Sequence, residues 1–213
     1  MRTLYWVRND LRLHDNETLQ HFVSSSKEGL LLWFENYSYR RALLNRKNYI
    51  DSALAEFQKD LQVYNLKLAV SHESIYESLE KLISEYKFDQ ICFTQHVGSE
   101  ELSEEKFVES LALKHSIKIK SFDDNFLVKP NNLPFELNKM PMVFTDFRKK
   151  LESQWSINKC VESKFPEVPK TLEGFNSHRP IENTKQIFAF GEKLTRLRTG
   201  LFLNYCGAIT LNT

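Results

Sequence analysis

The sequence predicts an α/β fold, in which a doubly wound, five-stranded parallel sheet is covered by helices on both faces. Two observations carry this prediction. Short apolar runs rich in β-branched and aromatic residues alternate with segments whose apolar residues recur every three or four positions. Each short run is apolar throughout rather than half polar, which is typical of strands buried on both faces of a parallel sheet. Sheets of this kind bind ligands at their carboxyl edge.

The strands are predicted at residues 3–7, 30–34, 66–70, 90–94 and 117–122. Because helical segments separate them, each strand should join the next by a right-handed crossover. We expect the Rossmann-like order 3-2-1-4-5 in the sheet.

The intervening helices have recognisable starts. Asp15 or Asn16 can cap a helix that continues to Phe22. A second helix is predicted over 47–64, where four apolar residues repeat at helical spacing. Ser74, followed three residues later by a glutamate, forms a capping-box pattern for the third helix. The fourth is predicted to start at residue 99, since two acids in its first turn complement the helix dipole.

The pattern changes after residue 122. Prolines at 130, 134 and 141 break the chain into a loop, and a further helix is predicted over 145–154. Prolines at 166, 169 and 180 with scattered charges predict an extended linker wrapping a surface.

The composition of the chain excludes some classes of function but does not identify the function. The 213 residues are 41% hydrophobic, and 29 basic residues nearly balance 28 acidic ones, so any anion site must be a local patch. Three cysteines lie far apart without CxxC spacing, which favours a reducing, cytoplasmic location. No apolar run approaches the roughly 18 residues that cross a bilayer, and no membrane partner is expected. The sequence does not indicate an oligomeric state.

Several familiar sites are missing from the pattern. There is no GxGxxG or GxxxxGK loop to cradle phosphates, and no HExxH or His/Cys metal spacing. The GxSxG elbow of hydrolases is also missing. We therefore predict neither a metal site nor catalytic residues within this chain.

Residues 5–19, YWVRNDLRLHDNETL, closely resemble the opening segment of photolyases and cryptochromes. We expect Arg8, Asp10 and Arg12 to interlock by charge-assisted hydrogen bonds and to pin the loop at the carboxyl edge of the sheet. In this interpretation they organise the fold or an interdomain seam rather than touch a ligand. The predicted structural residues of this segment are Trp6, Arg8, Asp10, Arg12, Asp15 and Asn16.

A second segment, NLPF at 132–135 followed by PMVFTDFRKKLE at 141–152, resembles the DASH branch of cryptochromes. The resemblance implies a structural or interdomain role for Phe144, Phe147 and Arg148. The alternative is a helix anchored by its aromatics that exposes a solvated basic face.

A third segment, QHVGSEELSEE at 95–105, resembles the DASH loop in which an acidic residue binds the pterin ring of a folate antenna. A carboxylate can accept paired N–H bonds from such a ring. The resemblance implies Glu100 or Glu101 as this residue, with Tyr37 and Ser38 of the loop 35–41 lining the same pocket. The alternative is that both glutamates only complement the helix dipole.

The resemblance runs from Arg2 to about Leu197, where residues 191–197 resemble the entry into the flavin domain of the family. It implies residues 1–125 as the α/β domain, 126–155 as a loop and helix packed on it, 156–190 as an interdomain linker, and 191–213 as a truncated start of the FAD domain or an unrelated tail. The helical FAD domain is expected to be missing.

The function implied by the resemblance is an antenna-binding and scaffolding domain of a blue-light flavoprotein that repairs cyclobutane pyrimidine dimers in DNA. A methenyltetrahydrofolate-type antenna is possible, FAD is not expected in this chain, and DNA would be bound only by the full-length protein together with the FAD domain. The alternatives are a signalling cryptochrome fragment, a nucleotide-binding domain of the universal-stress or electron-transfer-flavoprotein type, and a remnant that only folds.

Overall fold

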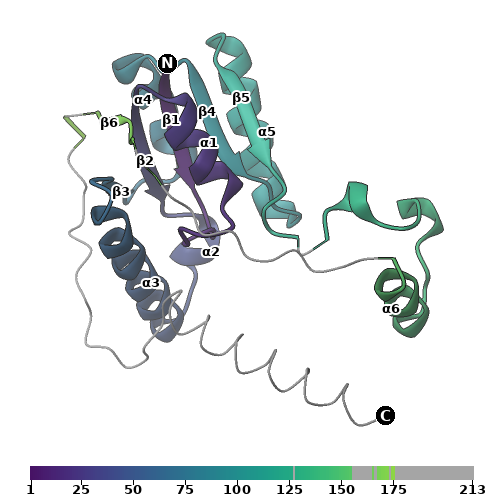
Figure 1. Cartoon of the computed structure of the whole chain (residues 1–213). Coiled ribbons are helices and arrows are strands. Elements are labelled where there is room, and N and C mark those ends of the chain that lie inside the picture. The colour runs from purple at the N-terminus through teal and green to yellow at the C-terminus, as the bar shows by residue number, and fades with distance from the viewer. Residues whose placement is uncertain (127, 155–164, 166, 173, 176–213) are drawn as a thin grey trace.

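The structure, a computed structural model, describes residues 1–126, 128–154, 165, 167–172, 174 and 175 (Figure 1). Its centre is a parallel sheet with the strand order β3-β2-β1-β4-β5. The strands are β1 (Arg2–Val7), β2 (Glu28–Phe34), β3 (Leu68–Ser71), β4 (Gln90–Thr94) and β5 (Lys118–Phe122). The predicted α/β class and strand order are therefore confirmed.

Helices cover both faces of the sheet, and the central strands are buried on both sides, whereas the edge strand β5 alternates exposed lysines with half-buried residues. Leu4 and Trp6 of β1 pack in a core with α4 (Ile75–Tyr86) and α5 (Ser99–Lys114). Tyr5 and Val7, which point to the opposite face, pack with α1 (Glu17–Ser25) and α3 (Leu44–Gln62). The two cores lie back to back through the sheet, as a doubly wound fold requires.

The start of α1 follows from local chemistry. The Asn16 side-chain oxygen accepts a hydrogen bond from the Leu19 N–H at 2.7 Å, so Asn16 is the cap. Asp15, the other predicted cap, takes a left-handed conformation with φ 47° and turns the chain into the helix. The capping box of Ser74 and Glu77 is also present at the start of α4.

Two short elements were not predicted. The helix α2 (Tyr37–Arg40) follows β2, and the strand β6 (Lys170–Thr171) pairs in parallel with Glu28 and Gly29 of β2. Leu172 and Phe175, beyond β6, pack against the core next to α4. Part of the segment predicted as a linker is thus joined to the sheet by backbone hydrogen bonds, which a pattern of side chains does not report.

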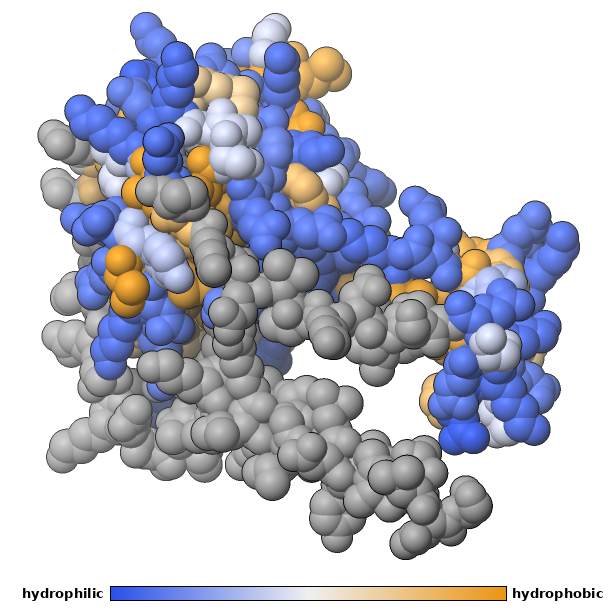
Figure 2. Space-filling model, viewed as in Figure 1, coloured by the Kyte–Doolittle hydropathy of each residue, from blue (hydrophilic) through white to orange (hydrophobic). Residues whose placement is uncertain are grey.

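Residues 126 and 128–154 form an arm that projects away from the sheet (Figure 1). It contains the short 3-10 helices η1 (Pro130–Asn132) and η2 (Leu137–Lys139) and ends in α6 (Phe144–Glu152). No residue of α6 is buried, and apolar surface interrupts the hydrophilic surface of the arm (Figure 2). This differs from the predicted packing of the helix on the domain, since the aromatic side chains of the arm pack on one another.

No helix within the described part of the chain has the length and apolar character needed to cross a membrane.

Candidate functional site at the carboxyl edge

Asp10 is the centre of a buried network where β1 and β4 end. It is fully buried, and its Oδ1 accepts a hydrogen bond from the backbone N–H of Arg8 at 3.0 Å. Its Oδ2 accepts hydrogen bonds from the hydroxyls of Tyr5 and Thr94, the latter at 2.8 Å. Burial, with the neighbouring Asp10 charge, raises the pKa of Tyr5 well above its usual value, so this phenol stays a donor. The network joins two strands that are far apart in sequence.

Asn16 closes the loop that follows β1. Its side-chain amide donates to the carbonyl oxygens of Asp10 at 3.1 Å and Arg12 at 2.9 Å. The same side chain caps α1 through its oxygen, so one residue satisfies backbone groups of both the loop and the helix. The loop is therefore held by hydrogen bonds from within the domain.

The Arg8 guanidinium is buried between a ring and two carboxylates. Its Cζ lies 4.3 Å from the centroid of the Trp6 ring, a cation–π contact. Its Nη1 forms an ion pair with Glu105, and its Nη2 lies 3.5 Å from the Glu104 carboxylate. The arginine and both glutamates have side chains that are less than a tenth exposed. This pairing attaches the end of β1 to α5.

The predicted interlock of Arg8, Asp10 and Arg12 side chains is wrong in its partners. The Asp10 carboxylate accepts a hydrogen bond from the backbone N–H of Arg8 rather than from its guanidinium. The Arg12 guanidinium donates to the carbonyl oxygens of Asp15 and Asp124, each at 2.9 Å. The fold supplies nearer partners because α5 and the end of β5 reach the same edge.

Glu104 and His96, which face Arg8, also have shifted pKa values. Burial raises the pKa of Glu104 to about 6, although the Arg8 charge opposes the shift. Burial lowers the pKa of His96, and the Arg8 charge adds to that effect. The Arg8 charge thus lowers the pKa of both Glu104 and His96.

A more open rim lies beside this network. The Ser38 hydroxyl of α2 lies 3.5 Å from the Glu100 carboxylate at the start of α5, and the neighbouring Tyr37 is 48% exposed. The Glu101 carboxylate instead folds back over Gly98 and takes the space where a side chain on that residue would begin. The structure therefore brings together three of the four predicted antenna residues.

The space beneath the rim is small. A cavity of about 10 Å³, the volume of one water, is lined by Trp6, Val7, Arg8, Trp33, Phe34, Asn36, Ile75 and Glu104. A ring system does not fit into it, so a planar ligand at this edge would lie over Tyr37, Ser38 and Glu100. The exposed Glu100 carboxylate suits the amino and N–H groups of such a ring.

The predicted residues of the arm form a separate group. Phe144, which is 72% exposed, stacks on Phe147 with ring centroids 6.4 Å apart. Phe147 also meets Phe135 edge on at 5.5 Å. Arg148 pairs with Glu152 one helical turn later at 3.6 Å. These contacts are internal to the arm and do not involve the network at the carboxyl edge.

The sequence analysis missed Glu104, Glu105 and Thr94. A signal for the glutamates exists, because the Ser-Glu-Glu triplet at 99–101 recurs four residues later at 103–105. The first pair of glutamates complements the helix dipole at the start of α5, whereas the second pair lies one turn further on, beyond that effect, and needs another explanation. Two buried acids on a helix require a cation, and the arginine after β1 is the residue that supplies it.

Fold and site together define a doubly wound α/β domain with a closed polar network at the carboxyl edge of its parallel sheet. Within the described residues, no group of His, Cys, Asp and Glu is arranged to hold a metal ion. Residues 3–170 match the DNA photolyase family, and the chain belongs to that family.

The chain is also similar to cryptochromes of the DASH type. It is 28% identical over 181 residues to the cryptochrome DASH of Gloeobacter violaceus, covering 80% of this chain and 36% of the relative. It is 28% identical over 169 residues to the chloroplastic/mitochondrial cryptochrome DASH of Arabidopsis thaliana, covering 73% of this chain and 29% of the relative. The chain thus spans about a third of the length of these relatives.

Solved structures share the fold. A Synechocystis cryptochrome superimposes with a TM-score of 0.78 at 24% identity, covering 93% of this chain and 45% of that protein. A class III photolyase from Agrobacterium tumefaciens gives 0.71 at 19% identity, covering 87% of this chain and 39% of that protein.

Proposed function

We propose that this chain is the antenna-binding and scaffolding part of a blue-light photolyase/cryptochrome flavoprotein. Membership of the family supports this role. The single observation that carries it is the contact between Ser38 and Glu100, which places a carboxylate and an aromatic neighbour on an open rim above a closed network. FAD binding, and either repair of DNA or light signalling, would belong to the length of the relatives that this chain does not span.

The rim fits a folate-type antenna better through Glu100 than through Glu101. The Glu100 side chain is exposed and faces α2, whereas the Glu101 carboxylate is turned toward Gly98. Tyr37 would supply a flat apolar surface for a pterin ring, and Ser38 would orient the carboxylate. Bound there, the antenna would absorb near-ultraviolet light and pass the excitation on.

The test is a titration of the chain with methenyltetrahydrofolate, followed by the near-ultraviolet absorption band. We expect a red-shifted band on binding. Glu100→Gln should raise the dissociation constant about tenfold or more, as expected for a lost charge-assisted hydrogen bond. Glu101→Gln is the matched control, and its affinity should stay within about twofold of the unchanged chain.

Equal affinity of both variants and the unchanged chain would remove the site assignment. No binding at all by the unchanged chain would contradict the antenna function itself.

Phe144, Phe147 and Arg148 are proposed to serve the seam with the remaining part of the flavoprotein. Their support is the aromatic cluster of the arm, which leaves one ring largely exposed, and the basic residues that follow it on α6.

A further inference from the structure

A corner that adjoins the rim at Tyr37 and Ser38 carries an unusual combination of cations and exposed leucines. Residues 36–50, from α2 into the start of α3, contain four cations and no acid, although the charges of the whole chain nearly cancel. In the middle of this segment, Leu43 and Leu44 are 83% and 71% exposed. We call residues 36–50 the α2–α3 corner; its cations are Arg40, Arg41, Arg46 and Lys47.

The exposed leucines do not serve folding. Leu43 is the N-cap residue of α3, and no side chain caps the helix there. Serine, threonine, aspartate or asparagine would satisfy a free N–H at this position, which leucine cannot. Leu44 follows in the first turn and is also exposed to solvent. At the α2–α3 corner, the start of α3 therefore lacks a side-chain cap, and two apolar side chains remain exposed.

The cations of the first turn also oppose the helix. Arg46 and Lys47 lie where the helix dipole is positive, and the first turn of α3 has no acid to balance them. Lys47 rests over the Tyr39 ring at 5.6 Å, and Arg41 lies over the Tyr37 ring at 5.1 Å. These contacts hold the cations in place without neutralising them, so the corner keeps a positive potential.

Arg40 differs from the other three cations. It pairs with Glu77 of α4 at 2.8 Å and donates to the His72 carbonyl oxygen at 2.9 Å. It therefore fixes α2 against its neighbours. Of the remaining cations, Arg41 and Arg46 are exposed and Lys47 is half-buried.

We propose that the α2–α3 corner contacts the surface of an anionic lipid membrane. The leucines would enter the boundary between headgroups and acyl chains, and Arg41, Arg46 and Lys47 would meet the headgroup phosphates. Tyr37 and Tyr49, each 48% exposed, suit the interfacial layer. A nucleic acid explains the cations less well, because aliphatic side chains neither pair with phosphate nor stack on bases. Tyr37 belongs to the proposed antenna rim as well, whereas the two leucines, Arg46 and Lys47 do not, so variants at these four positions leave the antenna residues unchanged.

The experiment is co-sedimentation of the full chain with vesicles. One set contains phosphatidylcholine and phosphatidylglycerol in equal amounts, and the other contains phosphatidylcholine alone. We expect partitioning onto the anionic vesicles only, weakened by added salt. Arg46→Gln/Lys47→Gln should lower the partition coefficient about 30-fold, at about 1 kcal/mol for each cation.

The leucines provide the sharper test. Leu43→Ser/Leu44→Ser should lower the partition coefficient about tenfold or more, while its melting temperature should not fall, because serine is the better cap. The matched control is Lys149→Gln/Lys150→Gln on α6, which removes two exposed cations elsewhere and should change partitioning less than about twofold.

Three outcomes would overturn the proposal. The first is equal sedimentation with anionic and neutral vesicles. The second is an unchanged partition coefficient in the folded leucine variant, or an equal loss in the α6 control. The third is binding of oligothymidylate, but of neither vesicle, that depends on Arg46 and Lys47, because this would assign the corner to nucleic acid.

Discussion

The two edges of the sheet use similar charged residues in opposite ways. At the carboxyl edge, Arg8 and Glu105 pair with side chains that are 4% and 8% exposed. Beside the amino edge, Lys114 and Glu80 pair at 2.6 Å with side chains that are 64% and 55% exposed. Coulomb attraction is strong in the first environment and screened in the second. An ion pair therefore holds elements of the fold together at the carboxyl edge, whereas an ion pair beside the amino edge contributes little to stability.

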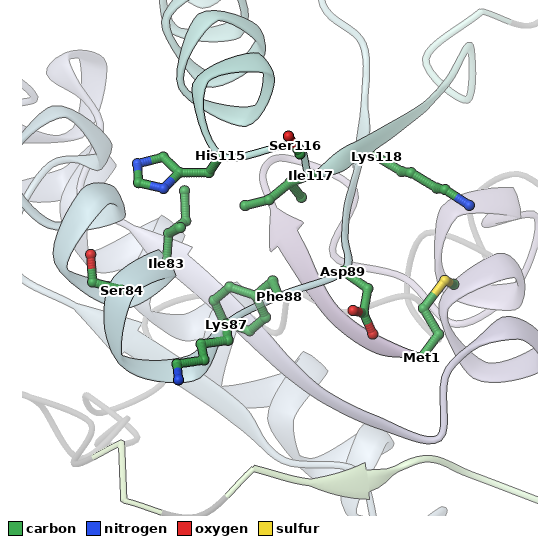
Figure 3. A pocket seen from close by; sticks show the side chains of 10 residues that line it. All are labelled: Met1, Ile83, Ser84, Lys87, Phe88, Asp89, His115, Ser116, Ile117 and Lys118. Atoms are coloured by element: carbon green, nitrogen blue, oxygen red, sulfur yellow. The ribbon is translucent and has the colours of Figure 1, made fainter.

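The amino edge is also the open one. A cavity of about 700 Å³ lies there, between the ends of α4 and α5 and the starts of the strands (Figure 3). Ile83, Phe88 and Ile117 form its apolar part, and charged side chains such as Lys87 and Lys118 surround it. At the carboxyl edge the corresponding space is filled by Arg8 and its partners. The volume of the cavity and the exposure of the ion pairs distinguish the two edges.

The largest effect is expected from Arg8→Met. This change leaves Glu104 and Glu105 buried without their cation, so it should lower the free energy of unfolding by about 3–5 kcal/mol. Urea denaturation followed by tryptophan fluorescence measures it. Arg8→Lys should lose less, because it keeps the charge but not the planar fork. A loss below about 1 kcal/mol in Arg8→Met would mean that the pair is no better than a surface contact.

A smaller, pH-dependent effect is expected from Glu104→Gln. The folded pKa of Glu104 is raised from 4.5 to about 6, so the folded state binds this proton more tightly than the unfolded state does. The resulting stabilisation is present below pH 4.5 and is lost as the pH rises through 6, amounting to about 2 kcal/mol.

Glu104→Gln should abolish this dependence. The free energy of unfolding should be compared between the unchanged chain and the variant from pH 4 to 8, because the difference removes the opposite contribution of His96, whose lowered pKa costs stability as the pH falls. Parallel curves for the two proteins would show that Glu104 titrates normally in the folded state.

The smallest effect is expected at the exposed pair. Lys114→Gln should leave the melting temperature indistinguishable from that of the unchanged chain, because a screened surface pair contributes little. Differential scanning calorimetry at low and high salt is the measurement. A clear drop that persists at high salt would place the amino edge in the same class as the carboxyl edge, because salt screens buried pairs much less than exposed ones.

The sequence by itself determined the class of fold and the local starts of helices. Strands buried on both faces are apolar throughout, and the caps at Asn16 and Ser74 depend only on residues up to three positions away. The short strand β6 could not be predicted, since it rests on backbone pairing with β2 that side-chain patterns do not encode. The short helix α2 does have a local signal, because the Asn36 side-chain oxygen accepts the Tyr39 N–H as a cap.

Only the tertiary structure decided the partners at the site. Arg8 and Glu105 are 97 positions apart and meet because β1 lies beside β4 and α5 follows β4. The tertiary structure also gives two glutamates of α5 different surroundings. Glu100 is exposed on the rim near Ser38, whereas Glu104, one helical turn later, is buried and has a raised pKa. A carboxylate's chemistry depends on its burial and its neighbouring charges, and both are set by segments that are distant in sequence.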